Sequence, residues 1–315
     1  VVGNMFADPE QQGERLKSLL SSQMKLVSRE LGELKGSLMK LGQMLSIYGE
    51  HFLPPEANAF LKSLQSQSPP LEWPAIEKAL NRHLGKERLG LLEIDHEAIA
   101  SASLGQVHRA RLKTGGPWLA MKIQYPGVDS AIDGDLKALK TLFSIAKIVP
   151  RSPKLDQLFE EVRTMLHQEV DYEGELMHMQ EFRKALLEDS RFIIAKPVPE
   201  FCTKRVLTMM LEEGHKVDSA EVRALSQDRR NSIASAALEL YFRELFKLKM
   251  MQTDPHFGNY RIRTGDRSDQ LILFDFGAVR KFNDQFLGPY SDLIRGALYR
   301  DKALLIRAAG KLGFI

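Results

Sequence analysis

Two short polar motifs near the end of the chain are its most constraining feature. Residues 254–259 read Asp-Pro-His-Phe-Gly-Asn, which places a carboxylate and a carboxamide five positions apart. Asp275-Phe276-Gly277 begins sixteen residues after Asn259. An apolar helical pattern over 231–251 precedes both motifs, and two strand-like segments, 260–263 and 270–274, lie between them. Either motif alone is most often a simple turn, so their order and spacing carry the functional signal.

These residue types in this order are typical of phosphoryl transfer. One Asp near the attacking oxygen orients it or accepts its proton. An Asn five residues later and the Asp of Asp-Phe-Gly hold Mg²⁺ over the phosphates. The spacing therefore predicts Asp254 as the catalytic Asp and Asn259 and Asp275 as magnesium ligands.

A lysine in a predicted hairpin adds a phosphate-binding group. Segments 98–112 and 117–123 are short, apolar and partly alternating, and Lys-Thr-Gly-Gly separates them, which predicts a β-hairpin. Lys122 ends the second strand in Leu-Ala-Met-Lys, where a kinase lysine contacts the α- and β-phosphates. An edge-strand lysine is the alternative for this motif alone. Its place in the order favours phosphate binding.

The segment before the hairpin contains alanine and serine where a kinase has a Gly-rich loop. Residues 99–107 read Ile-Ala-Ser-Ala-Ser-Leu-Gly-Gln-Val. Small side chains permit a close backbone approach, but their Cβ atoms narrow the allowed dihedrals. We therefore expect a phosphate cover that is stiffer than usual. A Walker A motif is absent from the sequence.

Residues 169–175 hold four carboxylates inside a helical pattern that is expected to run over 155–187. On one helix Glu169 and Glu173 would share a face, and Asp171 and Glu175 another. Like charges stacked in this way are costly without a cation. A solvated acidic face and a cluster neutralised by a lysine or a metal both remain open.

Composition limits the class of protein. The 315 residues predict two domains or lobes, and 27% charged with 43% hydrophobic residues indicates a globular chain. The 44 Lys and Arg against 41 Asp and Glu argue against a nucleic-acid binder that relies on bulk charge. One cysteine, Cys202, excludes an internal disulfide and favours an intracellular compartment. Because the chain starts without Met and stops inside a helical pattern, we expect it to be part of a longer protein.

The pattern of elements divides the chain into three parts. Helical periodicity over 11–48, with further helices to residue 84, predicts a helical extension over 1–90. A β-containing lobe would follow over 91–214, and an incomplete helical lobe with a short hairpin over 215–315. This arrangement is typical of α+β architectures with a cleft between lobes.

Together these motifs resemble those of the UbiB family of atypical protein-kinase-like proteins, which is linked to ubiquinone biosynthesis. The resemblance covers roughly residues 34–277. It rests on Lys40-Leu41-Gly42-Gln43, the Ala/Ser-rich loop, Lys122, Glu169-Val170-Asp171, and the motifs at 254–259 and 275–277. It implies an α+β, protein-kinase-like two-lobed fold with a family-specific N-terminal helical extension.

The resemblance also implies further site residues. In the family the Lys-x-Gly-Gln segment lies over the interlobe cleft, so Lys40, beside Gly42 and Gln43, would meet Glu169 and Asp171. Glu175 would pair with Lys122, and residues 206–214 would form the hinge beneath the adenine, with Met209 near the gatekeeper position. The implied nucleotide contacts are Ile99, Ala100, Ser101, Ala102, Ser103, Gln106, Val107, Lys122, Glu175, Leu211 and Glu212.

The implied function is an Mg²⁺-dependent atypical kinase or ATPase that binds ATP or ADP and supports ubiquinone biosynthesis. No Ala-Pro-Glu follows Asp275-Phe276-Gly277, and Lys40 would obstruct the cleft, so water or a small acceptor fits better than a protein. The alternative is a nucleotide-gated pseudokinase or scaffold for a lipid-biosynthetic complex. A small-molecule phosphotransferase ranks third, because the Lys-x-Gly-Gln motif is not expected there.

The partners and location follow from the same resemblance. We expect a nucleotide, a membrane surface or isoprenoid lipid, and ubiquinone-biosynthesis proteins as partners, and no nucleic acid. The expected location is the bacterial cytoplasm at the inner membrane face, or the matrix side of a mitochondrial membrane.

Overall fold

The computed structural model describes residues 37–49, 53–63, 70–102, 104–145, 152–254, 256–266 and 268–315. The chain forms two compact units: unit 1 is Val1–Tyr172 with Pro199–Thr208, and unit 2 is Glu173–Val198 with Met209–Ile315. The sequence predicted boundaries at residues 90 and 214. The observed units have other boundaries, since the chain passes from one unit to the other three times. The helical pattern expected over 11–36 lies outside the described residues.

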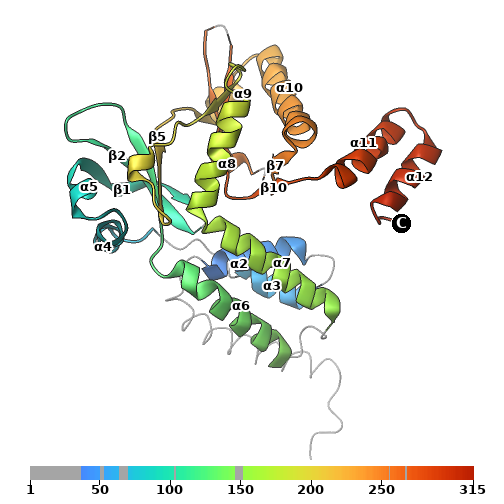
Figure 1. Cartoon of the computed structure of the whole chain (residues 1–315), viewed down its shortest axis with the longest axis horizontal. Coiled ribbons are helices and arrows are strands. Elements are labelled where there is room, and N and C mark those ends of the chain that lie inside the picture. The colour runs from blue at the N-terminus through green and yellow to red at the C-terminus, as the bar shows by residue number, and fades with distance from the viewer. Residues whose placement is uncertain are drawn as a thin grey trace, which may run out of the picture. The chain divides into compact units, whose positions relative to one another are not determined.

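Four helices of unit 1 pack around one apolar core (Figure 1). They are α2 (Ser37–Tyr48), α3 (Pro55–Ser63), α6 (Val128–Ile145) and α7 (Pro153–Glu169). Leu41 and Leu45 of α2 are fully buried, as the three- and four-residue spacing of leucines predicted. Phe143 of α6 meets Phe159 of α7 edge to face, with ring centroids 6.3 Å apart. This core holds the N-terminal helices on α6 and α7.

A four-stranded sheet in the order β1-β2-β3-β5 accompanies these helices. Its strands are β1 (Leu92–Ala102), β2 (Gly105–Leu112), β3 (Leu119–Gln124) and β5 (Val206–Met210), with α4 (Trp73–Leu84) and α5 (Lys86–Gly90) before β1. The hairpin predicted around residues 113–116 joins β2 to β3. The strand expected over 98–112 is instead divided, so residues 98–102 belong to β1. A Cβ at Gly105 would lie 2.3 Å from the Ile123 carbonyl oxygen, so only glycine allows β2 to begin so close to β3.

Unit 2 contains a mixed sheet in the order β4-β9-β8-β6 and a separate pair, β7 with β10. The strands are β4 (Phe192–Ile194), β6 (His215–Lys216), β7 (Met250–Gln252), β8 (Tyr260–Arg263), β9 (Gln270–Leu273) and β10 (Val279–Lys281). The strands expected at 260–263 and 270–274 are confirmed as the antiparallel pair β8 and β9. The helices are α8 (Tyr172–Ala185), α9 (Ala220–Arg223), α10 (Gln227–Arg243), α11 (Asp284–Leu298) and α12 (Lys302–Lys311).

The helix expected over 155–187 is two helices. Val170 ends α7 with φ −99° and ψ 0°, and the Asp171 amide donates to the Gln168 carbonyl at 3.0 Å. Val170 and Tyr172 are both buried, and one continuous helix would point two such residues to nearly opposite faces. The expected stacking of Glu169 on Glu173 and of Asp171 on Glu175 is therefore wrong.

The helix expected over 231–251 also ends early. After α10 the chain forms a turn of π-helix, η3 (Glu244–Leu248), and Lys249 adopts the left-handed conformation with φ 54°. Because a left-handed residue ends a right-handed helix, Met250 to Gln252 form strand β7 instead.

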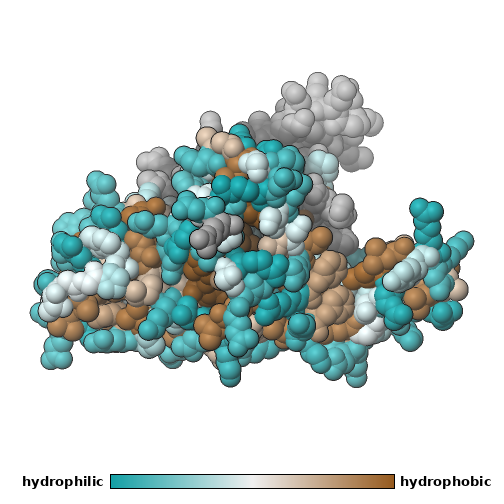
Figure 2. Space-filling model, turned by 90° about the horizontal axis from the view of Figure 1, so that it is seen from above, coloured by the Kyte–Doolittle hydropathy of each residue, from teal (hydrophilic) through white to brown (hydrophobic). Residues whose placement is uncertain are grey.

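Helices α11 and α12 form a hairpin at the end of the chain (Figure 1). A Cβ at Gly296 would lie 2.8 Å from the Leu305 amide nitrogen, so glycine permits this close packing. Leu298, Tyr299 and Ile306 stay exposed, and Figure 2 shows brown residues among teal ones in this part of the surface. Of the helices that the structure describes, none has the length and apolar character needed to cross a bilayer.

Candidate nucleotide-binding site

A buried ion pair joins two sequence motifs within unit 1. Lys40 of α2 places Nζ 2.8 Å from Oε1 of Glu169 at the end of α7, and the two side chains are only 6% and 7% exposed. Of the two contacts that the family resemblance implied for Lys40, the one with Glu169 is present, and the one with Asp171 stays a prediction. Gly42 is buried, whereas Gln43 and Asp171 are exposed. Because either charge alone would be costly to bury, the pair favours the packing of α2 on α7.

The Ala/Ser-rich segment is mostly strand. Residues 99–102 end β1, and Ala100 lies opposite Val107 of β2 in the antiparallel ladder. The side chains of residues 99–101 are exposed, and Ser103 lies outside the described residues. Ladder hydrogen bonds hold this backbone, and its role as a stiff phosphate cover stays a prediction.

Gln106, expected among the nucleotide contacts, has its side chain committed to unit 1. It is 1% exposed, accepts from the Leu71 amide at 2.8 Å and donates to the Leu71 carbonyl at 3.2 Å. Its Nε2 also lies 2.8 Å from Nε2 of His108, whose Nδ1 lies 2.8 Å from the Asp95 carbonyl oxygen. Burial lowers the pKa of His108, which favours the neutral ring that accepts from Gln106. The side chain of Gln106 therefore holds residue 71 against the sheet.

Lys122 lies on β3 and is half-buried. Its Nζ lies 5.1 Å from the ring centroid of Tyr172, a cation–π contact. The Tyr172 hydroxyl would lie 3.0 Å from a Cβ at Gly105, so the same ring packs against the start of β2. Glu175, the expected partner of Lys122, belongs to unit 2, and their pairing stays a prediction.

Hydrogen bonds in unit 2 draw its two polar motifs together. Nδ2 of Asn259 donates to the backbone carbonyl of Asp254 at 2.9 Å, which closes the loop over 254–259. The Asn259 carbonyl accepts from the Phe274 amide at 3.1 Å, and the Gly277 amide donates to Oδ1 of Asp275 at 2.9 Å. The loop and the Asp-Phe-Gly turn therefore lie side by side, as their spacing around the β8–β9 hairpin predicted.

The Asp-Phe-Gly turn also packs against α8. Phe276 is fully buried, with its ring centroid 5.0 Å from that of Phe182. Glu175, only 1% exposed, places Oε2 3.7 Å from where a Cβ at Gly277 would lie, and Oδ1 of Asp275 lies 3.3 Å from the same point. The turn thus gathers two carboxylates beside a glycine.

The oxygen atoms near this turn fit a magnesium ion. Asn259 uses Nδ2 to close its loop, which leaves Oδ1 as a ligand, and Asp275 adds a carboxylate. Mg²⁺ prefers oxygen and is commonly held by one or two protein groups together with substrate phosphates and waters. In the described part of the chain, no group of three or more His, Cys, Asp or Glu residues is arranged to hold a metal ion by itself. The two predicted ligands therefore suit a metal whose coordination a nucleotide completes.

The expected adenine-contacting segment follows β5. Leu211 and Glu212 are half-buried, and the Met210 amide donates to the Lys196 carbonyl at 2.8 Å. Arg263 of β8 binds the Glu212 carboxylate at 2.7 Å. These contacts fix residues 210–212 within unit 2, while the adenine contact itself stays a prediction.

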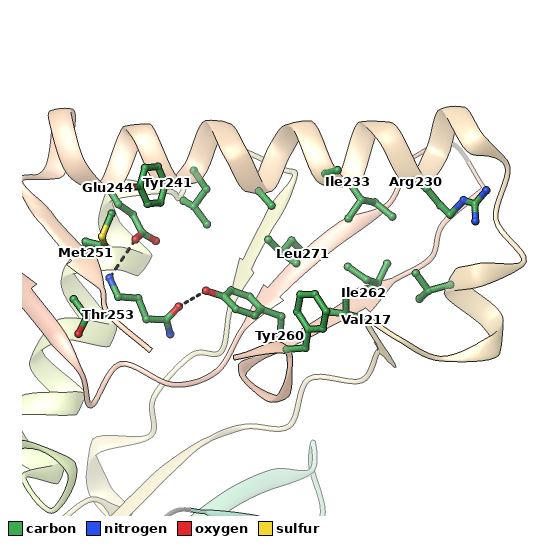
Figure 3. A pocket seen from close by; sticks show the side chains of 16 residues that line it. Val217, Arg230, Ile233, Tyr241, Glu244, Met251, Thr253, Tyr260, Ile262 and Leu271 are labelled. Carbon is green, nitrogen blue, oxygen red and sulfur yellow. Dashed lines mark hydrogen bonds between the residues drawn. The ribbon is translucent and has the colours of Figure 1, made fainter. Parts of the chain in front are cut away.

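Gln252 is a residue of this region that the sequence analysis missed. Its Nε2 donates to the Asp275 carbonyl, and its Oε1 accepts from the Tyr260 hydroxyl at 2.8 Å. The backbone amide of Gln252 donates to Oε2 of Glu244 at 3.2 Å. Figure 3 marks the bonds of Gln252 to Glu244 and Tyr260 with dashed lines. A polar residue between an apolar segment and Asp254 was the available signal.

Known proteins are similar to this chain in sequence. The ABC1 atypical kinase-like domain matches residues 63–309. The mitochondrial atypical kinase COQ8 of Saccharomyces cerevisiae is 32% identical over 302 residues, which cover 95% of this chain and 59% of the relative. AarF domain-containing protein kinase 1 of Xenopus tropicalis is 30% identical over 283 residues, 89% of this chain and 54% of the relative. The chain thus spans little more than half the length of these curated relatives.

A solved structure shares the fold as well. The complex of Rv3197 with erythromycin from Mycobacterium tuberculosis matches with a TM-score of 0.63 and 29% identity, covering 95% of this chain and 75% of that one. The α+β, kinase-like fold expected from the sequence is therefore confirmed. On these grounds the chain belongs to the ABC1 atypical kinase-like family, the UbiB family of the sequence resemblance, together with relatives named COQ8 and AarF kinases.

Proposed function

We propose that this chain binds ATP or ADP with Mg²⁺ and acts as an atypical kinase-like ATPase or phosphotransferase that supports ubiquinone biosynthesis. The observation that carries the proposal is the placement of the 254–259 loop beside Asp275. The Phe274 amide, next to Asp275, donates to the Asn259 carbonyl, while the Asn259 side chain closes the loop on Asp254. The names of the atypical kinase relatives support the reaction class.

Each residue has a distinct role in the proposed mechanism. Asn259 and Asp275 would hold the metal, and Lys122 would contact the α- and β-phosphates. Asp254 orients the acceptor oxygen and takes its proton as the bond to the γ-phosphorus forms and the bond to the β-phosphate oxygen breaks. Bound Mg²⁺ supplies positive charge that offsets the charge of the phosphates.

The acceptor that we propose is water or a small molecule. The buried Lys40–Glu169 pair holds α2 in place, and in the family resemblance this segment covers the peptide entrance. The mitochondrial names of several relatives support a mitochondrial location. Within it we propose the matrix side of a membrane, with an isoprenoid lipid or biosynthetic proteins as partners.

Nucleotide binding is tested by thermal shift with ADP and ATP, each with and without Mg²⁺. A ligand that binds only the folded state raises its stability, so we expect a Mg²⁺-dependent rise in Tm for the wild type. The rise should be lost in Asp275→Asn and kept in Asp266→Asn, which changes an exposed carboxylate in the β8–β9 turn. No shift in the wild type would contradict the proposal.

Phosphate release from ATP, with and without anionic liposomes, tests the chemistry. We expect turnover in the wild type and its loss in Asp254→Asn. Tight Mg²⁺-dependent nucleotide binding with no phosphate release under any membrane condition would instead support the nucleotide-gated scaffold.

A further inference from the structure

A large apolar cavity in unit 2 is not used by the proposed reaction. Its volume is about 720 Å³, within the range of small-molecule sites. Helix α10 forms one wall, and strands β8 and β9 lie opposite it (Figure 3). Its lining is mainly aliphatic and aromatic, with Ile233, Leu240, Tyr241, Ile262 and Leu271 among its residues.

Glu244 places a carboxylate in this apolar lining. It is 5% exposed, and its Oε2 accepts the Gln252 amide at 3.2 Å. Its Oε1 has no hydrogen-bond donor among the residues that the structure describes, and none of their cations pairs with it. Figure 3 shows the carboxylate directed from the helix toward the cavity. Oε1 is therefore left to accept from a donor inside the cavity, and a ligand hydroxyl can supply that hydrogen bond.

The cavity is long, with its acidic group at one end. Arg230 and Glu244 are fourteen positions apart on the same helical wall, which corresponds to about 21 Å at the rise of an α-helix. Figure 3 shows them at opposite ends, with Ile233 and Tyr241 between them. The Arg230 guanidinium donates to Gln227 Oε1 at 2.9 Å within its own helix. The lining between the two ends is apolar, which suits a hydrocarbon chain.

We propose that this cavity binds an elongated apolar molecule with a hydroxyl head. The hydroxyl donates to Oε1 of Glu244, and the hydrocarbon part lies between α10 and the strands that carry Ile262 and Leu271. Burial raises the pKa of Glu244 to about 7, and both protonation states offer an oxygen that accepts from a hydroxyl. This binding is independent of the nucleotide chemistry proposed above.

Decan-1-ol is the test probe, with decyl methyl ether as the matched probe that has no hydroxyl. Both are titrated at pH 8 against the whole chain, with unfolding temperature as the readout. We expect the alcohol to raise Tm and to bind about tenfold more tightly than the ether, the effect of one hydrogen bond to a charged group.

Two tryptophan variants locate the binding. Ala237 and Ser235 are both exposed on α10, but only Ala237 lines the cavity, so Ala237→Trp occupies the cavity whereas Ser235→Trp does not. We expect the alcohol shift to disappear in Ala237→Trp and to persist in Ser235→Trp. Circular dichroism checks folding, and Ala234→Trp fills the same wall if Ala237→Trp fails to fold.

Glu244→Leu tests the head group. The preference for alcohol over ether should vanish while the ether still binds. The proposal is overturned by an absent shift in the wild type, which would leave the cavity without this ligand class. It is equally overturned by a shift that survives Ala237→Trp, or by a preference that survives Glu244→Leu. Because binding is read directly, these outcomes are independent of nucleotide binding or turnover.

Discussion

Two glutamates, one in each unit, are buried to nearly the same degree and have different surroundings. Glu169 is 7% exposed and meets the Lys40 ammonium at 2.8 Å. Glu244 is 5% exposed and accepts one backbone N–H, with no cation pairing with it among the described residues. The first joins two helices, whereas the second is available to a proton or to a ligand hydroxyl. Burial alone therefore does not determine the role of a carboxylate, because the role also depends on which group binds it.

The largest expected effect comes from removing the partner of Glu169. Lys40→Met leaves a buried carboxylate without its cation, so we expect a loss of about 3 to 5 kcal/mol in the free energy of unfolding, measured by urea denaturation. Lys62→Met, at an exposed position of α3, serves as the control and should change little.

A double variant sharpens this result. Lys40→Met with Glu169→Leu removes both charges, and we expect it to recover most of the lost stability because an apolar pair of similar size suits the same site. A double variant as unstable as Lys40→Met would show that packing, and not the isolated charge, causes the loss.

The second expected effect concerns the pH dependence of Glu244. Its folded pKa of about 7 lies above the usual 4.5, so between these values the folded state binds more protons than the unfolded state. The stabilisation that Glu244 contributes by binding a proton is therefore fully present below pH 4.5 and is lost as pH rises through 7. Glu244→Gln should stabilise the protein by about 3 kcal/mol at pH 8 and by little at pH 4.5, in urea denaturation at both pH values.

Glu213→Gln changes an exposed glutamate of the same unit and should keep the pH slope of the wild type. If Glu244→Gln had the same pH dependence of the free energy of unfolding as the wild type, Glu244 would titrate like a solvated carboxylate. The contrast with Glu169 would then be one of geometry alone.

The smallest expected effect tests the hydrogen bonds around Glu244. Tyr260→Phe removes the hydroxyl that donates to Gln252, so we expect a loss of about 1 to 2 kcal/mol because Gln252 Oε1 loses its donor. Tyr299→Phe, at a residue that is 79% exposed, should have no measurable effect in the same urea experiment. Equal stability of both variants would show that water replaces the lost donor.

Elements with local signals could be predicted from the sequence. The β2–β3 and β8–β9 hairpins follow from alternation and turn residues, and the loop at 254–259 follows from spacing within a few residues. The helix over 155–187 was predicted wrongly, because burial of both Val170 and Tyr172 breaks a periodicity that otherwise continues. Tertiary contacts override helical propensity at that point.

Side-chain partners were harder to predict than elements. The side-chain amide of Gln106 binds the backbone of Leu71, 35 positions away, and no local pattern predicted this partner. Gln252 gave only a weak signal, although its side chain binds the carbonyl of Asp275, 23 positions away. Hydrogen-bond partners at such separations depend on how the chain packs, which no short motif contains.

The sequence by itself determined which residue types are available for the proposed chemistry and in what order they occur, because motif spacing is a local property of the chain. It also indicated the family, and through it the Lys40–Glu169 contact. Only the tertiary structure decided that Glu244 is buried beside an apolar cavity, that Gln252 links it to Asp275, and that the acidic run is divided between two helices. Burial and partner choice arise from contacts between segments that are distant in the chain, so they appear only once the chain is packed.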